Sequence, residues 1–474
     1  MMRLVSPRSR TKPWVVFVLL LFLVAVGTGA YLAWRQSVPG VRVTGMPPRL
    51  LGQKTAFTLV AETERGNVAS LEVRLLQDAS RAVITRQEGT LGRRVEVPIS
   101  VEPAAAGIRE GAAIVEVWAR DDFWRPLRRA PRPVATFPVT VDLTPPKLEV
   151  VATTPYVAPG GAGVVVLRTN DAARVDVRVG GSAFPAFAVG PEGTRVAFFA
   201  LGYNFASGTL LSAVAQDEAG NTSARALPSE ILPRRFRHDR IEVKDAFLEA
   251  KVPELLPQRA PSQSLVDAFL TINRDLRRQA EDTKRSVAAK TAPKVLWEGA
   301  FVQPKNTKVF SNFAETRTYV YQGREIDTQV HFGYDLASTK QAAVPAANKG
   351  VVVFAEPLTI YGNTVIVDHG LGLMTLYGHL SAIAVKSGEA VERGQEIGRT
   401  GMTGLAIGDH LHYEMLVHGV SVTPLEWWDA KWIRDRVAGP LQAAGIIADG
   451  AVPASAESSP KEPVRRRSRR ANRR

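Results

Sequence analysis

The sequence predicts a mostly β protein that follows a single N-terminal transmembrane helix. Three features of the 474 residues support this fold class. A long apolar run without charges lies near the N-terminus. Short segments of alternating polar and apolar residues, separated by Gly, Pro and Asn, fill most of the remaining chain. Six of the seven histidines lie between residues 331 and 418, and a hydrophobic fraction of 45% is enough for two to four separate cores.

The composition limits the chemistry available to the chain. It contains no cysteine, which excludes disulfides, thiolate-bound zinc or iron–sulfur clusters, and a cysteine nucleophile. Any metal site must therefore be built from His, Asp or Glu.

The apolar run, residues 13–34, holds 22 residues without a charge. About 20 residues suffice to span a bilayer. Trp14 at one end and Tyr31 with Trp34 at the other lie where aromatic side chains are enriched at membrane interfaces. We therefore expect a transmembrane anchor over 13–35.

The cations before this run set its expected orientation, because Lys and Arg are retained on the cytoplasmic side. The N-terminal segment is expected inside and the rest of the chain outside the cytoplasm. The cations are Arg3, Arg8, Arg10 and Lys12. The alternative is a cleaved signal peptide, but such peptides have apolar cores of about 7–15 residues and a small-residue cleavage site, for which 25–27 is a poor match.

The net charge of +14 is concentrated at the two ends of the chain. Residues 1–12 carry +4 and residues 461–474 carry +7, which leaves +3 for the 448 residues between them. The tail 451–474, rich in Ser, Pro and Arg, is expected to be disordered. Because it would lie outside the cytoplasm, anionic lipid or polymer suits it better than nucleic acid, and we expect no nucleic-acid partner.

Two immunoglobulin-like β-sandwiches are predicted over 40–143 and 144–232, where short alternating segments recur at regular spacing. The segment 117–122 resembles 213–218 at an offset of 96 residues, near the length of one such domain. Residues 144–146 and 217–222 resemble the boundary and the closing hairpin of bacterial immunoglobulin-like domains. We interpret these domains as spacers; a face that binds an envelope protein partner is the alternative.

A helical linker is predicted over 233–295. Ser264 and Asp267 have the spacing of a capping box, and apolar residues recur after them with a helical period. One amphipathic helix over about 265–288 is therefore predicted. We expect it to pack against a neighbouring domain; a position across a functional cleft is the alternative.

The clustered histidines suggest a metal or acid–base site. His331 and Asp335 are four residues apart, which places both side chains on one face of a helix or a strand. Gly333 between them favours a strand or turn. A pair at this spacing is common by chance, so it is weak evidence alone.

His410 and His412 would point to the same face of a strand, together with Glu414. His379 follows two further predicted strands, 365–369 and 373–376. Taken singly, the histidine pair also fits an exposed polar strand face, and His379 also fits a hydrogen-bonded histidine of the core.

In combination these segments resemble the lysostaphin-type, or LytM-type, zinc metallopeptidases, a family of peptidoglycan endopeptidases. The resemblance extends over about 295–428 and its elements occur in family order: 331–335, 344–352, 362–370, 376–380, 394–398, 401–404 and 410–414. It implies that His331, Asp335 and His412 bind one Zn²⁺ and that His379 and His410 are the catalytic histidines. It assigns His369, His418 and Glu414 structural or supporting places, and we give His238 no role.

The chemistry of these residue types agrees with the resemblance. Two imidazoles and one carboxylate leave a tetrahedral zinc with an open position for water. Peptide hydrolysis also needs a general base and a donor for the oxyanion. Since no His-Glu-x-x-His motif supplies a glutamate base, the two histidines would share these tasks, and the sequence leaves open which does which.

Two segments depart from the family pattern. Residues 311–314 read Ser-Asn-Phe-Ala where many members have Ser-x-Phe-Gly, and the loop expected over 316–329 is longer than a tight turn requires. Both concern the rim of the site. Some family members lack zinc ligands and only activate other wall hydrolases, so a non-catalytic envelope scaffold or activator is the alternative function. Here all five positions are filled.

The resemblance completes the predicted organisation. Since no second apolar run of comparable length follows the first, we expect a single-pass protein of the bacterial inner (cytoplasmic) membrane, with an extracytoplasmic or periplasmic catalytic domain. Its expected partners are peptidoglycan, the membrane through the N-terminal helix, and envelope proteins through the β-sandwiches. The expected segments are a cytoplasmic basic segment (1–12), the anchor (13–35), two immunoglobulin-like domains (40–143 and 144–232), the linker (233–295), an antiparallel-β metallopeptidase domain (296–430), a C-terminal helical extension (431–450) and the tail (451–474).

Overall fold

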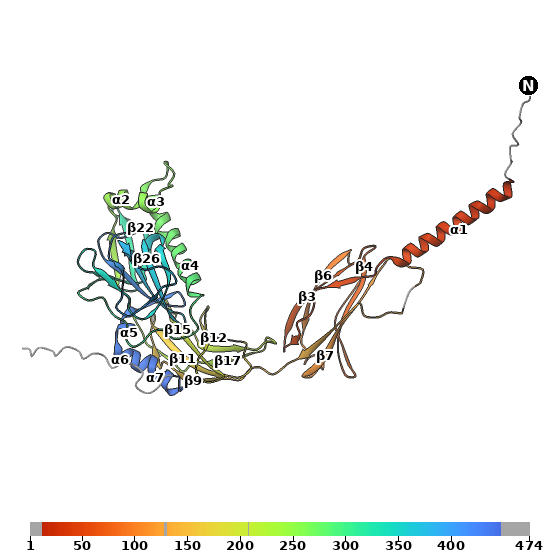
Figure 1. Ribbon diagram of the computed structural model, residues 1–474, viewed down its shortest axis with the longest axis horizontal. Coiled ribbons are helices and arrows are strands. Elements are labelled where there is room, and N and C mark those ends of the chain that lie inside the picture. Colours follow the sequence, from red (N-terminus) through yellow and green to blue (C-terminus); the bar gives the residue numbers. More distant parts are fainter. Residues whose placement is uncertain (1–11, 128–129, 207, 447–474) are drawn as a thin grey trace, which may run out of the picture. The chain divides into compact units, whose positions relative to one another are not determined.

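The computed structural model describes residues 12–127, 130–206 and 208–446, and it is mostly β. The basic residues at 3, 8 and 10 and the tail 451–474 lie outside the described residues. The chain forms two compact units (Figure 1). The first comprises the residues up to Pro146 with Gln216–Thr222, and the second comprises Lys147–Ala215 and the chain from Ser223 onward.

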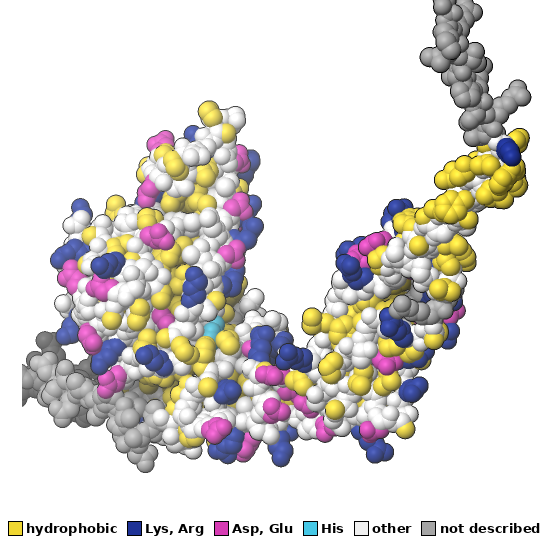
Figure 2. Space-filling model, turned by 45° about the vertical axis from the view of Figure 1, so that its right-hand side comes forward, with side chains coloured by type: hydrophobic (Ala, Val, Ile, Leu, Met, Phe, Trp, Pro, Cys, Tyr) yellow, Lys and Arg dark blue, Asp and Glu magenta, His cyan; other side chains and the backbone are white. Residues whose placement is uncertain are grey.

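The N-terminal apolar run forms one long helix, α1 (Pro13–Ser37). Proline at its first position fits the helix start, since the missing N–H has no partner there in any case. None of the described side chains of α1 is buried, and Figure 2 shows hydrophobic side chains along its length. The helix is long and apolar enough to cross a membrane.

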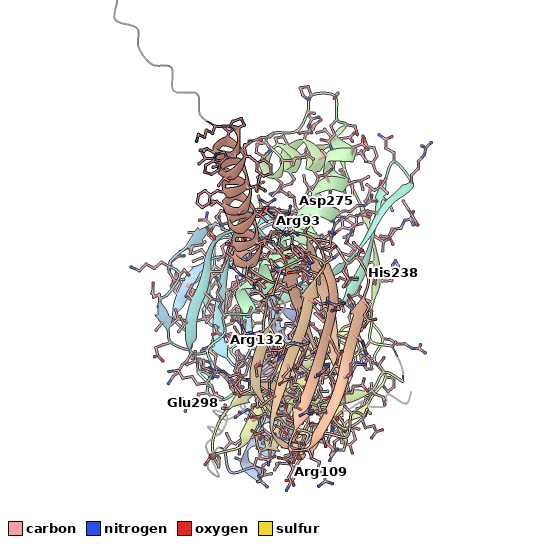
Figure 3. The ribbon with its side chains drawn as sticks, turned by 90° about the vertical axis from the view of Figure 1, so that its right-hand side faces the viewer. Arg93, Arg109, Arg132, His238, Asp275 and Glu298 are labelled. Atoms are coloured by element: carbon pink, nitrogen blue, oxygen red, sulfur yellow. The ribbon has the colours of Figure 1, made fainter. Side chains whose placement is uncertain are left out.

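The first unit contains two sheets, of order β1-β3-β6 and β2-β8-β7-β4-β5. Alternate side chains of the strands point inward, and Leu59 and Val97 of one sheet share a core with Leu71 and Val117 of the other. Arg93 lies at the end of the sheets from which α1 leaves, and Arg109 lies at the opposite end (Figure 3). The strands are β1 (Arg42–Thr44), β2 (Leu50–Leu51), β3 (Thr55–Glu62), β4 (Val68–Gln77), β5 (Ser80–Glu88), β6 (Arg94–Val101), β7 (Gly111–Asp121) and β8 (Ala135–Val141).

The second unit begins with two four-stranded sheets, of order β14-β15-β11-β9 and β13-β12-β16-β17, and a short β10–β18 pair. Their core is continuous with that of the C-terminal part. Trp427, fully buried, contacts Phe198 of β15 and Phe301 with ring centroids 6.0 and 5.6 Å apart. The strands are β9 (Leu148–Thr153), β10 (Tyr156–Val157), β11 (Ala162–Thr169), β12 (Arg174–Val179), β13 (Ser182–Pro185), β14 (Phe187–Ala188), β15 (Thr194–Ala200), β16 (Leu211–Gln216), β17 (Thr222–Ala226) and β18 (Glu230–Ile231).

The C-terminal part is built on an eight-stranded antiparallel sheet of order β20-β23-β31-β27-β26-β25-β29, in which β32 also pairs with β31. Two smaller sheets, β24-β30-β28 and β19-β21-β22, complete it. The strands are β19 (His238–Glu242), β20 (Lys308–Ser311), β21 (Glu315–Tyr321), β22 (Arg324–His331), β23 (Tyr334–Ala337), β24 (Ala343–Pro345), β25 (Gly350–Pro357), β26 (Asn363–Gly370), β27 (Leu373–Leu380), β28 (Ala382–Ile383), β29 (Ala390–Val391), β30 (Glu396–Arg399), β31 (Leu411–Val417) and β32 (Val420–Val422).

Helices that lie in the chain between β19 and β20 cover one face of the eight-stranded sheet. The predicted helix is present as α3 (Leu265–Thr271), a π-turn (Ile272–Leu276) and α4 (Arg277–Ala288), and the Ser264 side chain accepts from the Asp267 N–H at its start. A further helix, α2 (Asp245–Leu255), was not predicted. Phe269 and Ile272 share a buried cluster with Leu416 of β31, and Figure 1 shows α4 running beside the sheet.

The loop predicted over 316–329 is wrong, because this segment is a β-hairpin of β21 and β22. Its two-residue turn is Gln322-Gly323, and both residues have positive φ, of 49° and 78°. Such turns match the twist of paired strands, and glycine suits the second position.

After β32 the chain is helical as far as α7, with α5 (Pro424–Trp428), α6 (Ala430–Ile433), a π-turn (Arg434–Ala438) and α7 (Gly439–Ala443). The end of the predicted extension, 447–450, lies outside the described residues.

Candidate metal centre

Strand register brings the predicted ligands together. Asp335 of β23 pairs directly with His412 of β31, and Gly378 of β27 pairs with His412 from the other side. His331 is the last residue of β22 and reaches the same point through the short turn that leads to β23. Gly333 in that turn has no space for a side chain, since a Cβ there would lie 2.5 Å from the Tyr413 carbonyl oxygen and 2.7 Å from His412 Nε2.

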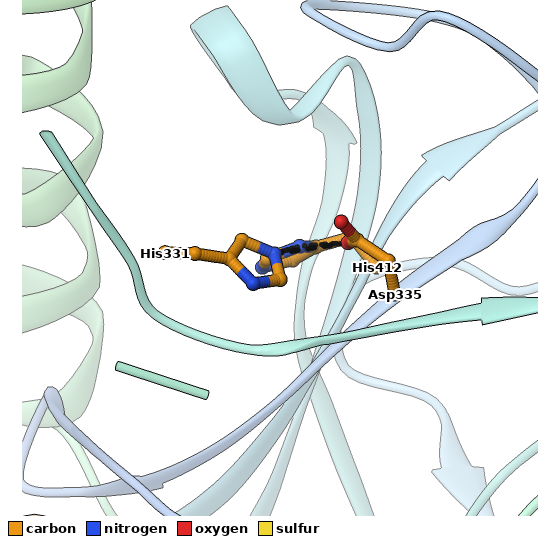
Figure 4. A group of neighbouring side chains, drawn as sticks. All are labelled: His331, Asp335 and His412. Atoms are coloured by element: carbon orange, nitrogen blue, oxygen red, sulfur yellow. Dashed lines mark hydrogen bonds and ion pairs between the residues drawn. The ribbon is translucent and has the colours of Figure 1, made fainter. Parts of the chain in front are cut away.

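The three side chains present one ligand atom each to a common point (Figure 4). His331 Nε2 lies 2.9 Å from Asp335 Oδ1, His412 Nδ1 lies 3.0 Å from the same oxygen, and the two nitrogens are 3.1 Å apart. All three residues are buried. Ligands of a tetrahedral zinc at about 2.0–2.1 Å lie roughly 3.3 Å apart, so these separations fit such an ion with a small outward adjustment.

The outer hydrogen bonds of the two imidazoles determine which nitrogens face the centre as lone pairs. His331 Nδ1 lies 2.9 Å from the Asn312 carbonyl oxygen, and His412 Nε2 lies 2.9 Å from Glu414 Oε1. Both partners only accept, so each of these nitrogens carries the proton. The facing atoms are then three acceptors in contact, an arrangement that a cation between them would stabilise.

The surroundings keep His331 and Asp335 in forms that can bind a metal, whereas hydrogen bonds to the Asp335 and Glu414 carboxylates raise the pKa of His412 against the effect of burial. Burial lowers the pKa of His331 to about 4, so its imidazole is neutral at neutral pH. Burial would raise the pKa of the Asp335 carboxyl, but its interactions with His331, His410 and His412 hold it well below its usual value. Arg317 of β21 binds the other Asp335 oxygen, with Nη2 3.0 Å from Oδ2.

The two predicted catalytic histidines lie against this centre. The His379 ring centroid is 4.9 Å from that of His410 and 5.6 Å from that of His412. His379 Nδ1 donates to the Thr403 carbonyl oxygen at 2.8 Å, which leaves Nε2 unprotonated in the neutral ring. Burial, with His410 and His412 adding to it, places the pKa of His379 well below 6.5. His379 also has φ of +61°, a conformation that a non-glycine residue rarely adopts without support.

His410 lies beside the centre, just before β31. Its Nδ1 lies 2.6 Å from the Gly408 carbonyl oxygen, and its Nε2 lies 3.5 Å from Asp335 Oδ1. Its side chain is 13% exposed, more than those of the three ligand residues. All five predicted site residues therefore lie in one cluster.

The remaining histidines lie outside this cluster. His369 is fully buried and bonded through Nδ1 to the Lys349 carbonyl oxygen and through Nε2 to the Thr375 hydroxyl. His418 stacks on Phe187 with ring centroids 5.9 Å apart. His238 lies on β19 and is bonded to the Thr318 hydroxyl.

Two charged residues at the site were not predicted from the sequence. Arg317 lies in the segment that was interpreted as a loop, and no motif marks it. Lys284 of α4 is fully buried, with Nζ 2.8 Å from Glu414 Oε2. A signal for Lys284 exists: Ala280, Lys284 and Ala288 are spaced by four along one buried face of the helix, where a lysine is out of place unless it is paired.

Two imidazoles and a carboxylate on adjacent strands, flanked by two further histidines, define the site as a candidate metallopeptidase centre. Residues 329–424 match Peptidase family M23. The C-terminal part of the chain is thus a peptidase M23 domain of the LytM or lysostaphin type, and all five site residues lie within the match.

Curated relatives share this segment. The chain is 40% identical over 119 residues to the peptidoglycan DD-endopeptidase ShyA of Vibrio cholerae, covering 25% of this chain and 27% of ShyA. It is 40% identical over 97 residues to the DD-carboxypeptidase/endopeptidase Mpg of Neisseria meningitidis, covering 20% and 22%. The match thus spans about a quarter of the length of each relative.

Among solved structures, the catalytic domain of lysostaphin from Staphylococcus simulans is 26% identical, with a TM-score of 0.23, covering 26% of this chain and 92% of that one. A zinc-containing peptidase from Vibrio cholerae is 14% identical, with a TM-score of 0.26, covering 66% and 81%.

Proposed function

We propose that this protein is a zinc endopeptidase that hydrolyses the peptide cross-links of peptidoglycan. The observation that carries the proposal is the set of three buried acceptor atoms, His331 Nε2, Asp335 Oδ1 and His412 Nδ1, all within 3.1 Å of one another. Two imidazoles and one carboxylate are a ligand set of catalytic zinc sites. The names of the relatives that share this segment, DD-endopeptidase among them, support the substrate class.

Zn²⁺ held by these residues would act as a Lewis acid that polarises the carbonyl oxygen of the substrate peptide and lowers the pKa of a bound water. His331 and His412 bind through nitrogens whose opposite ring positions are held by Asn312 and Glu414. Arg317 holds the second oxygen of Asp335, so this carboxylate is fixed in orientation.

His379 and His410 carry the proton chemistry. His379 is the base, because its ring is neutral and its Nδ1 proton is committed to the Thr403 carbonyl oxygen, leaving Nε2 free to accept. His410 is the donor to the oxyanion in its doubly protonated form, in which Nδ1 donates to the Gly408 carbonyl oxygen and Nε2 carries a proton beside Asp335 Oδ1.

The apolar helix α1 is the membrane anchor in this proposal, with the N-terminus in the cytoplasm and the catalytic part in the periplasm. An aromatic cluster at its C-terminal end supports a membrane interface at that level. Arg35 donates to the Trp124 carbonyl oxygen and lies 4.3 Å from the Phe123 ring centroid, while Trp34 and Trp124 are both about half exposed. The paired sheets over 40–143 and 144–232 would be immunoglobulin-like spacers that offer faces to envelope partners.

Digestion of purified, cross-linked peptidoglycan tests this function. The full chain with one equivalent of zinc is expected to convert cross-linked muropeptide dimers into monomers, with new peptide termini identified by mass. Asp335→Asn, which keeps the volume of the side chain, is expected to abolish the conversion. A folded, zinc-loaded chain that binds peptidoglycan without cutting it would instead identify a scaffold or activator.

A further inference from the structure

A lysine of helix α4, which precedes the eight-stranded sheet in the chain, is buried beside the candidate metal centre. Lys284 of α4 has no exposed side-chain surface. Its Nζ lies 2.7 Å from Glu281 Oε1 and 2.8 Å from Glu414 Oε2. The hydroxyls of Tyr361 and Ser421 complete its surroundings at 3.2 Å each. Removing an ammonium group from water costs free energy, and these four polar partners offset that cost. The presence of a buried lysine at this position therefore requires an explanation.

One of these partners, Glu414, also contacts the proposed metal ligand His412. Glu414, fully buried on β31, uses its two oxygens differently. Oε2 accepts from Lys284 and from the Ser421 hydroxyl at 2.7 Å, and Oε1 accepts from His412 Nε2 at 2.9 Å. The opposite nitrogen of the same ring, Nδ1, is the one that faces Asp335 and His331. Lys284 is thus connected to the centre through one carboxylate and one imidazole.

We propose that Lys284 is a positioning residue of the metal centre, holding Glu414 as an oriented carboxylate so that Glu414 fixes His412 with Nδ1 toward the metal. This inference rests on the proposed function. An ionised acceptor behind a ligating imidazole fixes the ring and its tautomer and makes the ligand more basic.

The charges around Glu414 explain why a lysine is needed. Glu414 has no exposed surface, and Glu281 and Asp335 add further negative charge nearby. A buried carboxylate is costly unless it is paired and hydrogen-bonded. Without Lys284, only the Ser421 hydroxyl would donate to Oε2, and the carboxylate that orients the His412 ring would be held less firmly.

Helix α4 is held in place independently of this lysine. The β31–β32 turn lies against it, because a Cβ at Gly419 would lie 2.8 Å from the Arg285 Cα. Thr359 donates to the Leu276 carbonyl oxygen just before α4, and Ala280 and Ala288 are buried on either side of Lys284. Lys284 therefore lies in a helix packed on the sheet, and it precedes the predicted start of the metallopeptidase domain at 296.

Lys284→Met in the full chain tests the proposal, because methionine keeps an unbranched side chain of similar length without its charge. The zinc dissociation constant, measured by competition with a chelator in the absence of substrate, is expected to rise about 10- to 100-fold, as for other partners behind metal ligands. Arg285→Met on the same helix is the matched control: Arg285 is 56% exposed and pairs only with Asp282 among the described contacts, so its zinc affinity is expected to stay within twofold of wild type.

The double variant Lys284→Met/Glu414→Gln separates a positioning role from a structural one. If Lys284 acts through Glu414, the double variant binds zinc about as weakly as Glu414→Gln alone. Two fully additive losses, or a folded Lys284→Met chain with wild-type zinc affinity and only a lower melting temperature, would overturn the proposal.

Lys284→Gln serves if the methionine variant does not fold, because it keeps a donor to Glu414 without the charge. It is expected to weaken zinc binding at least tenfold, and wild-type affinity would again overturn the role. The Co²⁺-loaded wild type and variant are expected to differ in their visible absorption, which reports the ligand field at His412. A wild-type chain that binds no zinc would remove the proposed function, and this inference with it.

Discussion

At the scale of single residues, hydrogen bonds to the outer ring nitrogens of His331 and His412 determine which nitrogens face the proposed metal. Asn312 and Glu414 hold the outer nitrogens of His331 and His412, so the inner nitrogens can only accept. The combination of motifs predicted the three proposed ligands and a supporting place for Glu414 on the strand face of His412. It could not predict the Asn312 partner, because a backbone carbonyl carries no sequence signal.

His331→Ala, Asp335→Ala and His412→Ala are each expected to lose both zinc and hydrolysis. Each removes one of the three proposed ligands, and two ligands do not hold a catalytic zinc. Zinc content by elemental analysis and turnover on cross-linked peptidoglycan check this. His238→Ala is the control that keeps both properties, because the described contact of this ring is to the Thr318 hydroxyl and not to any of the five site residues. An Asp335→Ala chain with wild-type zinc affinity would remove this carboxylate from the ligand set.

His379→Ala and His410→Ala are expected to keep zinc and to lose about 10²- to 10⁴-fold in turnover, because in the proposed mechanism neither binds the metal and both carry proton chemistry. The double variant is expected to be far from additive. Turnover, zinc content and melting temperature are measured on the same preparations. Near-wild-type turnover by folded, zinc-loaded His379→Ala would remove this residue from the mechanism.

His369 is expected to make stability depend on pH. Burial lowers its pKa to about 4 from 6.5, so between these values the unfolded chain binds a proton that the folded chain does not. The free energy of unfolding therefore falls as the pH falls from 6.5 toward 4, by at most about 3 kcal/mol from this group. Urea denaturation at pH 7 and pH 4.5 is expected to show a smaller loss for His369→Gln. Equal losses would show that His369 does not titrate on unfolding.

At the scale of elements, the central strand β31 assembles the site through its two neighbours. Asp335 of β23 pairs with His412 on one side, and Gly378 of β27 pairs with His412 on the other. Period-two alternation predicted that His410, His412 and Glu414 share a strand face. The same alternation over 316–321 was interpreted as part of a loop, although the Gln322-Gly323 turn signals a hairpin, so Arg317 was missed. The contribution of α4 depends on a long-range contact that helical periodicity alone cannot reveal.

Gly333→Ala is expected to disrupt the β22–β23 turn and to weaken zinc binding. The added Cβ would lie 2.5 Å from the Tyr413 carbonyl oxygen and 2.7 Å from His412 Nε2, and a backbone atom cannot rotate away. Zinc affinity and melting temperature measure the effect. Gly181→Ala is the matched control, since nothing lies within 4 Å of its added Cβ. A Gly333→Ala chain that matches this control would contradict the packing of the turn.

At the scale of the whole molecule, the second unit joins the catalytic sheet to the helices and sheets that precede it. Arg234 binds Glu426 at 2.8 Å, and the Thr154 hydroxyl donates to the Arg436 carbonyl oxygen at 2.7 Å. Sequence patterns predicted an apolar helix, alternating strands, a helical segment and a metal domain in this order. Nothing in those patterns predicted that the paired sheets after Lys147 share one core with the C-terminal sheet, because packing between domains leaves no periodic signal.

A reporter fused after residue 446 is expected to be active only outside the cytoplasm, because the cations before α1 hold the N-terminus inside. Alkaline phosphatase and a fluorescent protein that folds only in the cytoplasm give opposite readouts. Replacing Arg3, Arg8, Arg10 and Lys12 with glutamine is expected to weaken this orientation. A reporter active only in the cytoplasm would contradict both the topology and the wall substrate.

Anomalous diffraction from crystals of the full chain at the zinc edge tests the central claim most directly, namely that three acceptor atoms enclose a metal ion. The predicted result is one peak bonded to His331 Nε2, Asp335 Oδ1 and His412 Nδ1 at about 2.0–2.2 Å, with a fourth position open toward His379 and His410. Zinc-treated crystals with no peak between these three atoms would contradict the account.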